Sequence, residues 1–276
     1  MSTDEVDLDE CFKVAKRLAF EAGKMIKDAF SQKKNVETKA SFSDLVTETD
    51  KRVEDSLFST IRQTFPSHCF IGEESTSAGA QCELTDRPTW IIDPIDGTTN
   101  FVHTFPFTCI SIGFLVNKKA MIGIIYNPVL DDMYTARAGH GAFCNDKKIH
   151  VSGCNDYSQA LLIIDTGACA KNEDIDCHYE NMRRHKKHSR GIRAIGSAAL
   201  SMCLVACGAA DAYYEFGIHC WDMAAGVIIV EEAGGTLCGP DGSTLNILER
   251  SCLVTSSKKL AQDMVKDITI VHFPSD

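Results

Sequence analysis

The amino-acid sequence predicts a mixed α/β protein in two halves, residues 1–152 and 153–276, that fold as one compact unit. Three patterns in the 276 residues support this: helical periodicity at the start, short strands in the middle, and alternating strands and helices from about residue 160. The first half should therefore be an α+β unit with helices on an antiparallel sheet. The second half should be an α/β unit, with the boundary near residues 152–158.

The first half opens with two amphipathic helices. Residues 7–30 place apolar side chains at helical spacing, and residues 51–64 do the same until Pro66 ends the pattern. Strands follow, since residues 108–116 and 120–126 flank a short polar turn and predict a hairpin. The strands expected to continue this sheet are 133–136 and 141–151.

The second half alternates strands with helices. The expected strands are 160–165, 192–196 and 212–216, and the expected helices are 197–207 and 222–233. Ser197 has the residue type of a helix N-cap, and Gly234 and Gly235 can end the last helix. This order of elements is typical of an α/β unit.

The charge balance excludes several classes of function. The net charge of −10 argues against a general binder of nucleic acid or of anionic membranes. The acidic start lacks the order of a signal peptide, and no apolar window approaches the roughly 18 residues of a membrane span. We therefore expect a cytoplasmic protein with no nucleic-acid or membrane partner.

Cysteines and a basic run are two further features of the composition. Thirteen cysteines are present without any Cys-x-x-Cys pair, which argues against a structural zinc site. The basic run from Arg183 to Arg190 could be a targeting or polyanion-binding patch, but we favour a solvated loop.

The segment WIIDPIDGTTNF places two acids directly after an apolar strand. Asp93 and Asp96 must repel each other, and no basic residue lies between Trp90 and Val102. A hard divalent cation would neutralise the pair, because such ions take several oxygen ligands. The alternative is that both acids only cap the turn and the helix that follows.

Other acidic strand and helix ends favour the cation. Glu73 and Glu74 follow an apolar strand, and Asp222 lies in the first turn of an apolar helix. A further acidic group comprises Asp44, Glu48 and Asp50. If these ends converge, they form an oxygen-rich site for two or three metal ions. The Gly97-Thr98-Thr99 turn offers backbone N–H groups to a phosphate, so the pattern indicates phosphoryl transfer to water.

At this point the sequence resembles a known family. WIIDPIDGTTNFVHTFPF and WDMAAGVIIVEEAGG resemble the two signatures of the inositol monophosphatase family, and GEES and LVTETD lie where that family has them. The resemblance extends to about residue 270, and ADAYYEFGIHCWD is similar to animal-type members. It implies a layered αβαβα sandwich, a homodimer, Mg²⁺-dependent hydrolysis of myo-inositol monophosphate and inhibition by Li⁺.

The resemblance also implies metal ligands. Glu73, Asp93 and the Ile95 carbonyl would hold one magnesium ion, and Asp93, Asp96 and Asp222 a second. Glu73 with water would support a third ion. Two or three Mg²⁺ ions per site are therefore expected.

Further roles follow from the same resemblance. Gly97 and Thr98 would hold the phosphate through backbone N–H groups, and Thr98 with Asp50 would orient the attacking water. Glu215 and the backbone of Ala198 would contact inositol hydroxyls. The chain departs from the family at Ala168, where many relatives have a serine, so the ranking of substrates stays open.

Two alternatives remain beside this hypothesis. A related phosphatase could act on a sugar bisphosphate or a 3′-phosphoadenosine nucleotide, although the segment 191–216 offers Arg193 and no basic cluster near Glu215. A weakly catalytic metal-binding protein is disfavoured, because the acidic residues of both signatures are intact. His219 could be a core or a site residue, and Lys39 could steer phosphate or lie in solvent.

Overall fold

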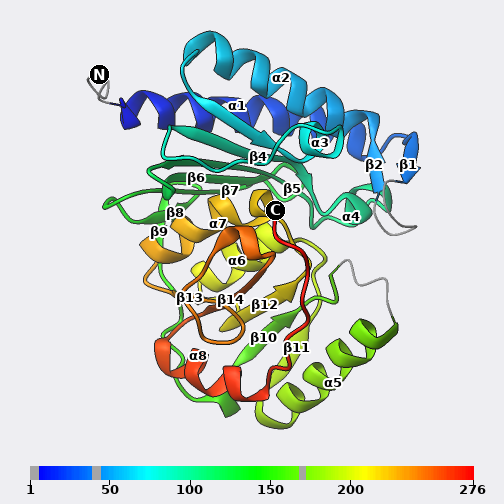
Figure 1. Ribbon diagram of the computed structural model, residues 1–276, viewed down its shortest axis with the longest axis vertical. Helices are drawn as coiled ribbons and strands as arrows, with labels where there is room; N and C mark the ends of the chain where they lie inside the picture. The colour runs from blue at the N-terminus through cyan, green and yellow to red at the C-terminus, as the bar shows by residue number, and fades with distance from the viewer. Residues whose placement is uncertain (1–5, 39–44, 168–171) are drawn as a thin grey trace.

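Five layers of helices and sheets make up the molecule. The computed structural model describes residues 6–38, 45–167 and 172–276. Figure 1 shows α1 and α2 above a first sheet, α6 and α7 below it, then a second sheet, with α5 and α8 outermost. This order of layers confirms the predicted αβαβα sandwich.

The first sheet has seven strands and carries two long helices on its outer face. Its strand order is β3-β4-β5-β6-β7-β8-β9, and β3 pairs with β4 in parallel while the other neighbours are antiparallel. The elements of this half are α1 (Leu8–Phe30), β1 (Val36–Thr38), β2 (Leu45–Thr47), α2 (Glu48–Thr64), β3 (Cys69–Gly72), α3 (Glu73–Ser77), β4 (Thr89–Asp96), α4 (Thr98–Val102), β5 (Cys109–Val116), β6 (Lys119–Asn127), β7 (Asp132–Arg137), β8 (Ala142–Cys144) and β9 (Lys147–Ile149).

The second sheet has five strands in the order β11-β10-β12-β14-β13. The strands β11, β10 and β12 run parallel, and β14 is antiparallel to its neighbours β12 and β13. The elements of this half are η1 (Tyr157–Gln159), β10 (Leu161–Ile164), α5 (Asn172–His188), β11 (Gly191–Arg193), α6 (Ala198–Ala206), β12 (Ala212–Phe216), α7 (Cys220–Glu232), β13 (Thr236–Cys238), η2 (Ile247–Glu249), β14 (Ser251–Thr255), α8 (Lys258–Met264) and η3 (Val265–Asp267).

Most predicted elements are confirmed, with shifted ends. The second helix starts at Glu48 rather than residue 51, because Thr47 and Asp50 form a capping box there. The last predicted helix starts at Cys220, two residues early. The parallel pairing of β3 with β4 differs from the predicted antiparallel sheet. The predicted cap of α6 is confirmed, since the Ser197 side chain accepts the N–H of Leu200.

The basic run was wrongly predicted to be a loop. Its residues 183–188 form the last turns of α5, and only Ser189 and Arg190 lie beyond the helix. The buried face of α5 is made by His178, Asn181 and His185. Because these three residues are polar, the helical period has no apolar signal in the sequence.

One helix lies unusually close to the first sheet. A Cβ atom at Gly123 of β6 would be 2.3 Å from the Ala225 carbonyl oxygen of α7. A Cβ atom at Gly113 of β5 would be 2.7 Å from the Cβ atom of Ala224. The missing side chains therefore allow α7 to rest directly on the backbone of two central strands.

Both sheets share a core through α6 and α7. One cluster of buried side chains joins Ile125 of β6, Met202 of α6, Ile229 of α7 and Tyr213 of β12. The division of the chain near residue 152 stays a prediction. Among the residues described, no helix has the length and apolar character that a membrane span requires.

Candidate metal centre

Three carboxylates meet between the two sheets. Asp93 and Asp96 come from the end of β4, and Asp222 comes from the first turn of α7. One oxygen of each lies within 4.8 Å of the others, and Asp93 and Asp96 are only 2% and 5% exposed. The two acids of β4 are thus part of the strand, although the sequence suggested that the strand ends before them.

The electrostatics of this cluster call for a cation. Burial raises the pKa of Asp93 well above its usual range, and repulsion from Glu73, Asp96 and Asp222 raises it further. Burial, followed by repulsion from Asp96, raises the pKa of Asp222 to about 7. A hard divalent cation fits this donor set, because it binds carboxylate oxygens and removes the repulsion among them.

Asp96 is held by the start of α6. Its Oδ1 accepts the N–H of Ala198 at 3.2 Å, and its Oδ2 accepts the N–H of Ala199 at 3.1 Å. The hydroxyl of Ser197 also donates to Oδ2, as does the Cys109 thiol at 3.4 Å. The backbone of Ala198 was expected to contact inositol, and its N–H is here donated to Asp96.

The turn after β4 brings Thr98 to Asp50. Gly97 has φ +81°, and a Cβ atom there would lie 2.9 Å from the Phe107 carbonyl oxygen, so a glycine is required. The Thr98 hydroxyl lies 3.3 Å from Asp50 Oδ1 and 3.0 Å from the Ile95 carbonyl oxygen. The expected contact between Thr98 and Asp50 is therefore present.

Asp50 is fully buried at the start of α2. Burial raises its pKa to about 7, although hydrogen bonds from the hydroxyl and N–H of Thr47 oppose the shift. A carboxylate of this pKa can accept a proton near neutral pH. Asp93 is also fixed locally, because its Oδ1 accepts the Ile95 N–H at 2.9 Å.

Glu73 acts electrostatically on the cluster, because β3 is parallel to β4. Gly72 pairs with Ile92, so Glu73 follows β3 where Asp93 continues β4. The start of α3 is held by Glu54, which accepts the N–H groups of Glu74 and Ser75, both at 2.8 Å. Sequence reasoning missed Glu54, although an acid at helical spacing from Leu57, Phe58 and Ile61 was a visible signal.

Glu215 lies at the end of β12 and is 7% exposed. The Tyr213 hydroxyl donates to its Oε2 at 2.7 Å, and burial together with the charge of Asp165 raises the pKa of Glu215 well above its usual range. Sequence reasoning missed Asp165, whose Oδ1 accepts the N–H groups of Ile195 and Gly196 at 2.9 and 3.0 Å. In the sequence it comes after an apolar run as Asp93 does, so the signal was present.

The structure brings together most of the predicted site residues. The three cluster aspartates lie together, Thr98 contacts Asp50, and Glu73 acts electrostatically on Asp93. Lys39, Asp44 and Ala168 lie outside the described residues.

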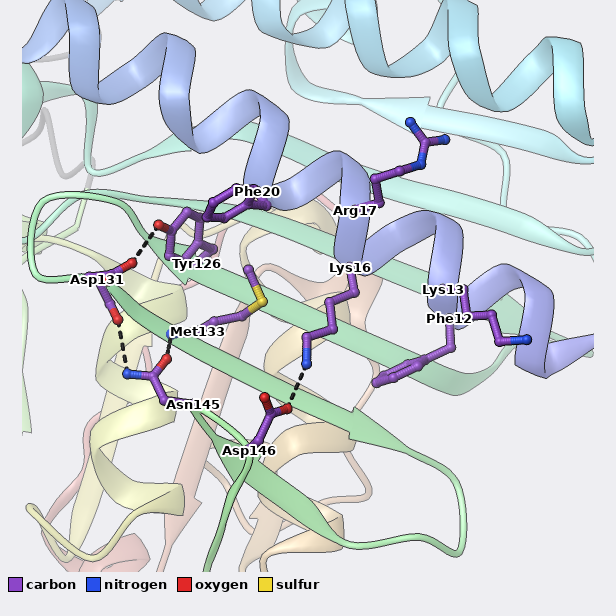
Figure 2. Close-up of a pocket in the computed structure, with 10 residues that line it drawn as sticks. All are labelled: Phe12, Lys13, Lys16, Arg17, Phe20, Tyr126, Asp131, Met133, Asn145 and Asp146. Carbon is purple, nitrogen blue, oxygen red and sulfur yellow. Dashed lines mark hydrogen bonds and ion pairs between the residues drawn. The ribbon is translucent and has the colours of Figure 1, made fainter.

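A hollow beside the chain's first helix is separate from these acids. It has a volume of about 550 Å³, and its charges are partly paired, with Lys16 bound to Asp146 at 2.6 Å and Arg17 to Glu21 at 3.1 Å. Figure 2 shows this hollow, which is lined by Phe12, Lys13, Lys16, Arg17, Phe20, Tyr126, Asp131, Met133, Asn145 and Asp146. None of the cluster residues lines it, so it is not the metal centre.

Solved structures share this fold across almost the whole chain. An inositol monophosphatase from Anabaena matches with a TM-score of 0.83 and 33% identity, covering 95% of this chain and 96% of that one. A staphylococcal IMPase-II with bound inositol monophosphate matches with a TM-score of 0.78 and 30% identity over 94% and 93% of the two chains. The fold and the carboxylate cluster define a metal-dependent phosphatase that hydrolyses phosphomonoesters.

Sequence comparison places the protein more narrowly within that class. Inositol monophosphatase 1 of Bos taurus is 49% identical over 268 residues, which cover 97% of each chain. The model of the inositol monophosphatase family matches residues 7–272. The chain belongs to the inositol monophosphatase family.

Proposed function

We propose that the protein hydrolyses myo-inositol monophosphate to myo-inositol and inorganic phosphate, with Mg²⁺ as its metal. The observation that carries the proposal is the cluster of Asp93, Asp96 and Asp222, whose oxygens lie within 4.8 Å of one another. Membership of the family supports the substrate. Inhibition by Li⁺ belongs to the same proposal, because a small monovalent cation can compete for a weakly held metal position.

The proposed ligands divide into two overlapping sets. Glu73, Asp93 and the Ile95 carbonyl would hold one ion, and Asp93, Asp96 and Asp222 another, with Glu73 supporting a third. Bound Mg²⁺ would supply Lewis-acid stabilisation of the phosphate oxygens and of the attacking water. The all-oxygen donor set supports this choice of metal over a softer one.

Thr98 and Asp50 have the geometry to position that water. When the Thr98 hydroxyl donates to Asp50 Oδ1 at 3.3 Å, its oxygen lone pairs can accept a hydrogen bond from water. Asp50 can then take up the proton, because burial raises its pKa to about 7. The N–H groups of Gly97 and Thr98 would bind the phosphate oxygens at the start of α4.

Glu215 would recognise the sugar-like part of the substrate. Its Oε2 accepts the Tyr213 hydroxyl, which leaves acceptor sites on a carboxylate that has up to four. Vicinal hydroxyls of inositol are suitable donors. The Ala198 N–H could take part only by sharing its hydrogen bond to Asp96 at 3.2 Å.

A panel of phosphate-release assays tests the proposal. The substrates are inositol 1-phosphate, a sugar bisphosphate, 3′-phosphoadenosine 5′-phosphate and 2′-AMP, each across a range of Mg²⁺ with and without Li⁺. We expect the highest kcat/KM for inositol 1-phosphate, loss of activity in EDTA, and inhibition by Li⁺. Preference for a bisphosphate, or equal rates without metal, would contradict the proposal.

A nucleotide monophosphate is the second candidate substrate. A staphylococcal IMPase-II structure with bound 2′-AMP matches this chain with a TM-score of 0.78 and 31% identity. The 2′-AMP arm of the panel addresses it, with turnover near that of inositol 1-phosphate supporting a broader specificity.

We also propose a cytoplasmic homodimer. The family supports both properties, and the net charge of −10 suits a protein that does not associate with anionic surfaces. Sedimentation equilibrium at several protein concentrations measures the assembly, with a mass near twice 30.3 kDa expected. Fractionation of cells measures the location.

A further inference from the structure

The C-terminal segment of the chain folds back onto the start of α7. In Figure 1 the C-terminal end lies beside α7, beneath the first sheet. Asp276, at this end, is almost buried, with a side chain only 6% exposed. It lies beyond residue 272, where the match to the family model ends.

Asp276 binds the first turn of α7 through both carboxylate oxygens. Its Oδ2 accepts the backbone N–H of Cys220 at 2.8 Å, and its Oδ1 lies 2.5 Å from His219 Nδ1. The backbone N–H of Asp276 is donated to the Leu248 carbonyl oxygen at 3.0 Å, which fixes the segment that carries it. A carboxylate at a helix N-terminus is stabilised by the N–H groups exposed there.

The same turn carries a cluster carboxylate. The backbone N–H of His219 is donated to Asp222 Oδ2 at 2.6 Å, and the His219 ring stacks on Trp221 with a centroid separation of 4.4 Å. His219 therefore contacts Asp276 through its ring and Asp222 through its backbone. A shift of this residue would move Asp222 relative to Asp93 and Asp96.

A second contact holds the approach to this turn. Phe273 packs against Gly217, where a Cβ atom would lie 2.9 Å from the ring. Arg250 donates to the Gly217 carbonyl oxygen at 2.7 Å and lies 4.0 Å from Asp276 Oδ1. Residues 273–276 thus fix both ends of the link between β12, which carries Glu215, and α7.

We propose that Asp276 is a positioning residue, which holds the first turn of α7 so that Asp222 keeps the place it needs to bind a divalent cation with Asp93 and Asp96. The proposal rests on the assignment of Asp222 as a metal ligand in the proposed function. Partners that orient ligands from behind change metal affinity by roughly 10–100-fold when removed. Asp276 acts on the metal only through the first turn of α7.

Direct binding of Mn²⁺ tests this without substrate. We expect Asp276→Ala to raise the Mn²⁺ dissociation constant about tenfold, since the effect of one such orienting partner lies at the lower end of this range. Asp276→Asn should give an intermediate value, because an amide oxygen can still accept one of the two hydrogen bonds. Titration calorimetry measures the constant on the whole protein.

Asp263→Ala is the matched control. Asp263 is an aspartate of the same C-terminal region whose partners are Lys259 and Lys266, so its removal deletes an equal charge without touching α7. This control should bind Mn²⁺ as the wild type does.

In assays, Asp276→Ala should need about tenfold more Mg²⁺ for half-maximal rate, while kcat and KM at saturating Mg²⁺ stay close to the wild type.

Two results would be unfavourable, and they can be told apart. If Asp276→Ala lowers thermal stability and activity but leaves the Mn²⁺ dissociation constant unchanged, the residue is only structural and the inference is wrong. If Asp222→Asn and the wild type bind Mn²⁺ equally, the cluster assignment itself fails, and with it the proposed function.

Discussion

The starts of α6 and α7 both hold a carboxylate of the metal centre, but they do so in opposite ways. At α6 the carboxylate is Asp96, a residue of β4, and four donors from Ser197, Ala198, Ala199 and Cys109 surround it. At α7 the carboxylate is Asp222, a residue of the helix itself. Its Oδ2 accepts the His219 N–H at 2.6 Å.

The two carboxylates therefore differ in how much each contributes to the stability of the fold and how much to metal binding. Asp96 joins a strand of the first sheet to a helix of the second half, so its hydrogen bonds contribute to stability even without metal. Burial raises the pKa of both acids, but the hydrogen bonds from Ser197, Cys109, Ala199 and Ala198 oppose that rise at Asp96, whereas at Asp222 the pKa reaches about 7. Asp222 therefore depends more on a bound cation than Asp96 does.

The largest expected effect is on turnover, and it should be equal at both helix starts. Asp93→Asn, Asp96→Asn and Asp222→Asn should each lower kcat by about 10³-fold or more, because each removes charge worth several kcal/mol to a metal-assisted reaction. Steady-state rates at saturating Mg²⁺ measure this. A near-normal rate for one of the three would remove that residue from the metal centre.

The start of α4 also belongs to the site, and it contributes the Thr98 hydroxyl rather than a carboxylate. Thr98→Ala should lower kcat by about 10²–10⁴-fold, the usual contribution of a positioned proton transfer. Asp50→Asn should cost a similar factor, and the double variant little more, because the two side chains act as a unit. Rates that multiply in the double variant would show separate roles.

Stability of the metal-free protein should distinguish Asp96 from Asp222. Asp96→Asn should lower the free energy of unfolding by about 1–3 kcal/mol, since an amide N–H₂ must then face a buried donor. Asp222→Asn should leave it unchanged or raise it, because one of three repelling acids is removed. Urea denaturation in EDTA measures both, and a loss of equal size in the two variants would contradict the comparison.

The last expected effect is the pH dependence of metal-free stability. Asp50 and Asp222 have pKa values of about 7 in the folded protein, against 3.8 as a reference for the unfolded chain. The folded state therefore keeps protons that the unfolded state has released, and stability falls as pH rises from about 4 to about 7. Melting temperatures in EDTA should follow this fall.

Two comparisons sharpen the pH experiment. Saturating Mg²⁺ should reduce the part of the fall in stability that comes from the cluster, because the ion stabilises the ionised carboxylates. Asp222→Asn should make the fall shallower but not abolish it, since Asp50 titrates in the same range. Melting temperatures that rise between pH 4 and pH 7 in the metal-free wild type would contradict the raised pKa values of Asp50 and Asp222.

The sequence predicted those parts of the site whose signal is local. Asp93, Asp96 and Asp222 each stand beside an apolar run, so their positions at strand or helix ends could be inferred. Asp165 carries the same signal but was read only as the end of a strand. The layered fold followed mainly from the family resemblance, because periodicity alone does not order the layers.

The features that the sequence did not predict depend on contacts between residues distant in sequence, or on residue types that are unusual for their position. Asp276 is 54 residues from Asp222, and nothing near Asp276 in the sequence indicates where it binds. Helix α5 escaped detection because His178 and His185, not apolar residues, cover its buried face. The parallel pairing of β3 with β4 likewise depends on how the strands pack in the folded protein, which the local sequence does not show.

The close approach of α7 to Gly113 and Gly123 limits how this site can change by mutation. A side chain at Gly123 would enter the space of the Ala225 carbonyl, so the body of the helix cannot slide or turn without altering the first sheet, and only its first turn can adjust Asp222. The carboxylates are therefore carried on a stiff support. New specificity would arise more easily near Glu215, which lies at the end of β12, where the chain leaves the second sheet.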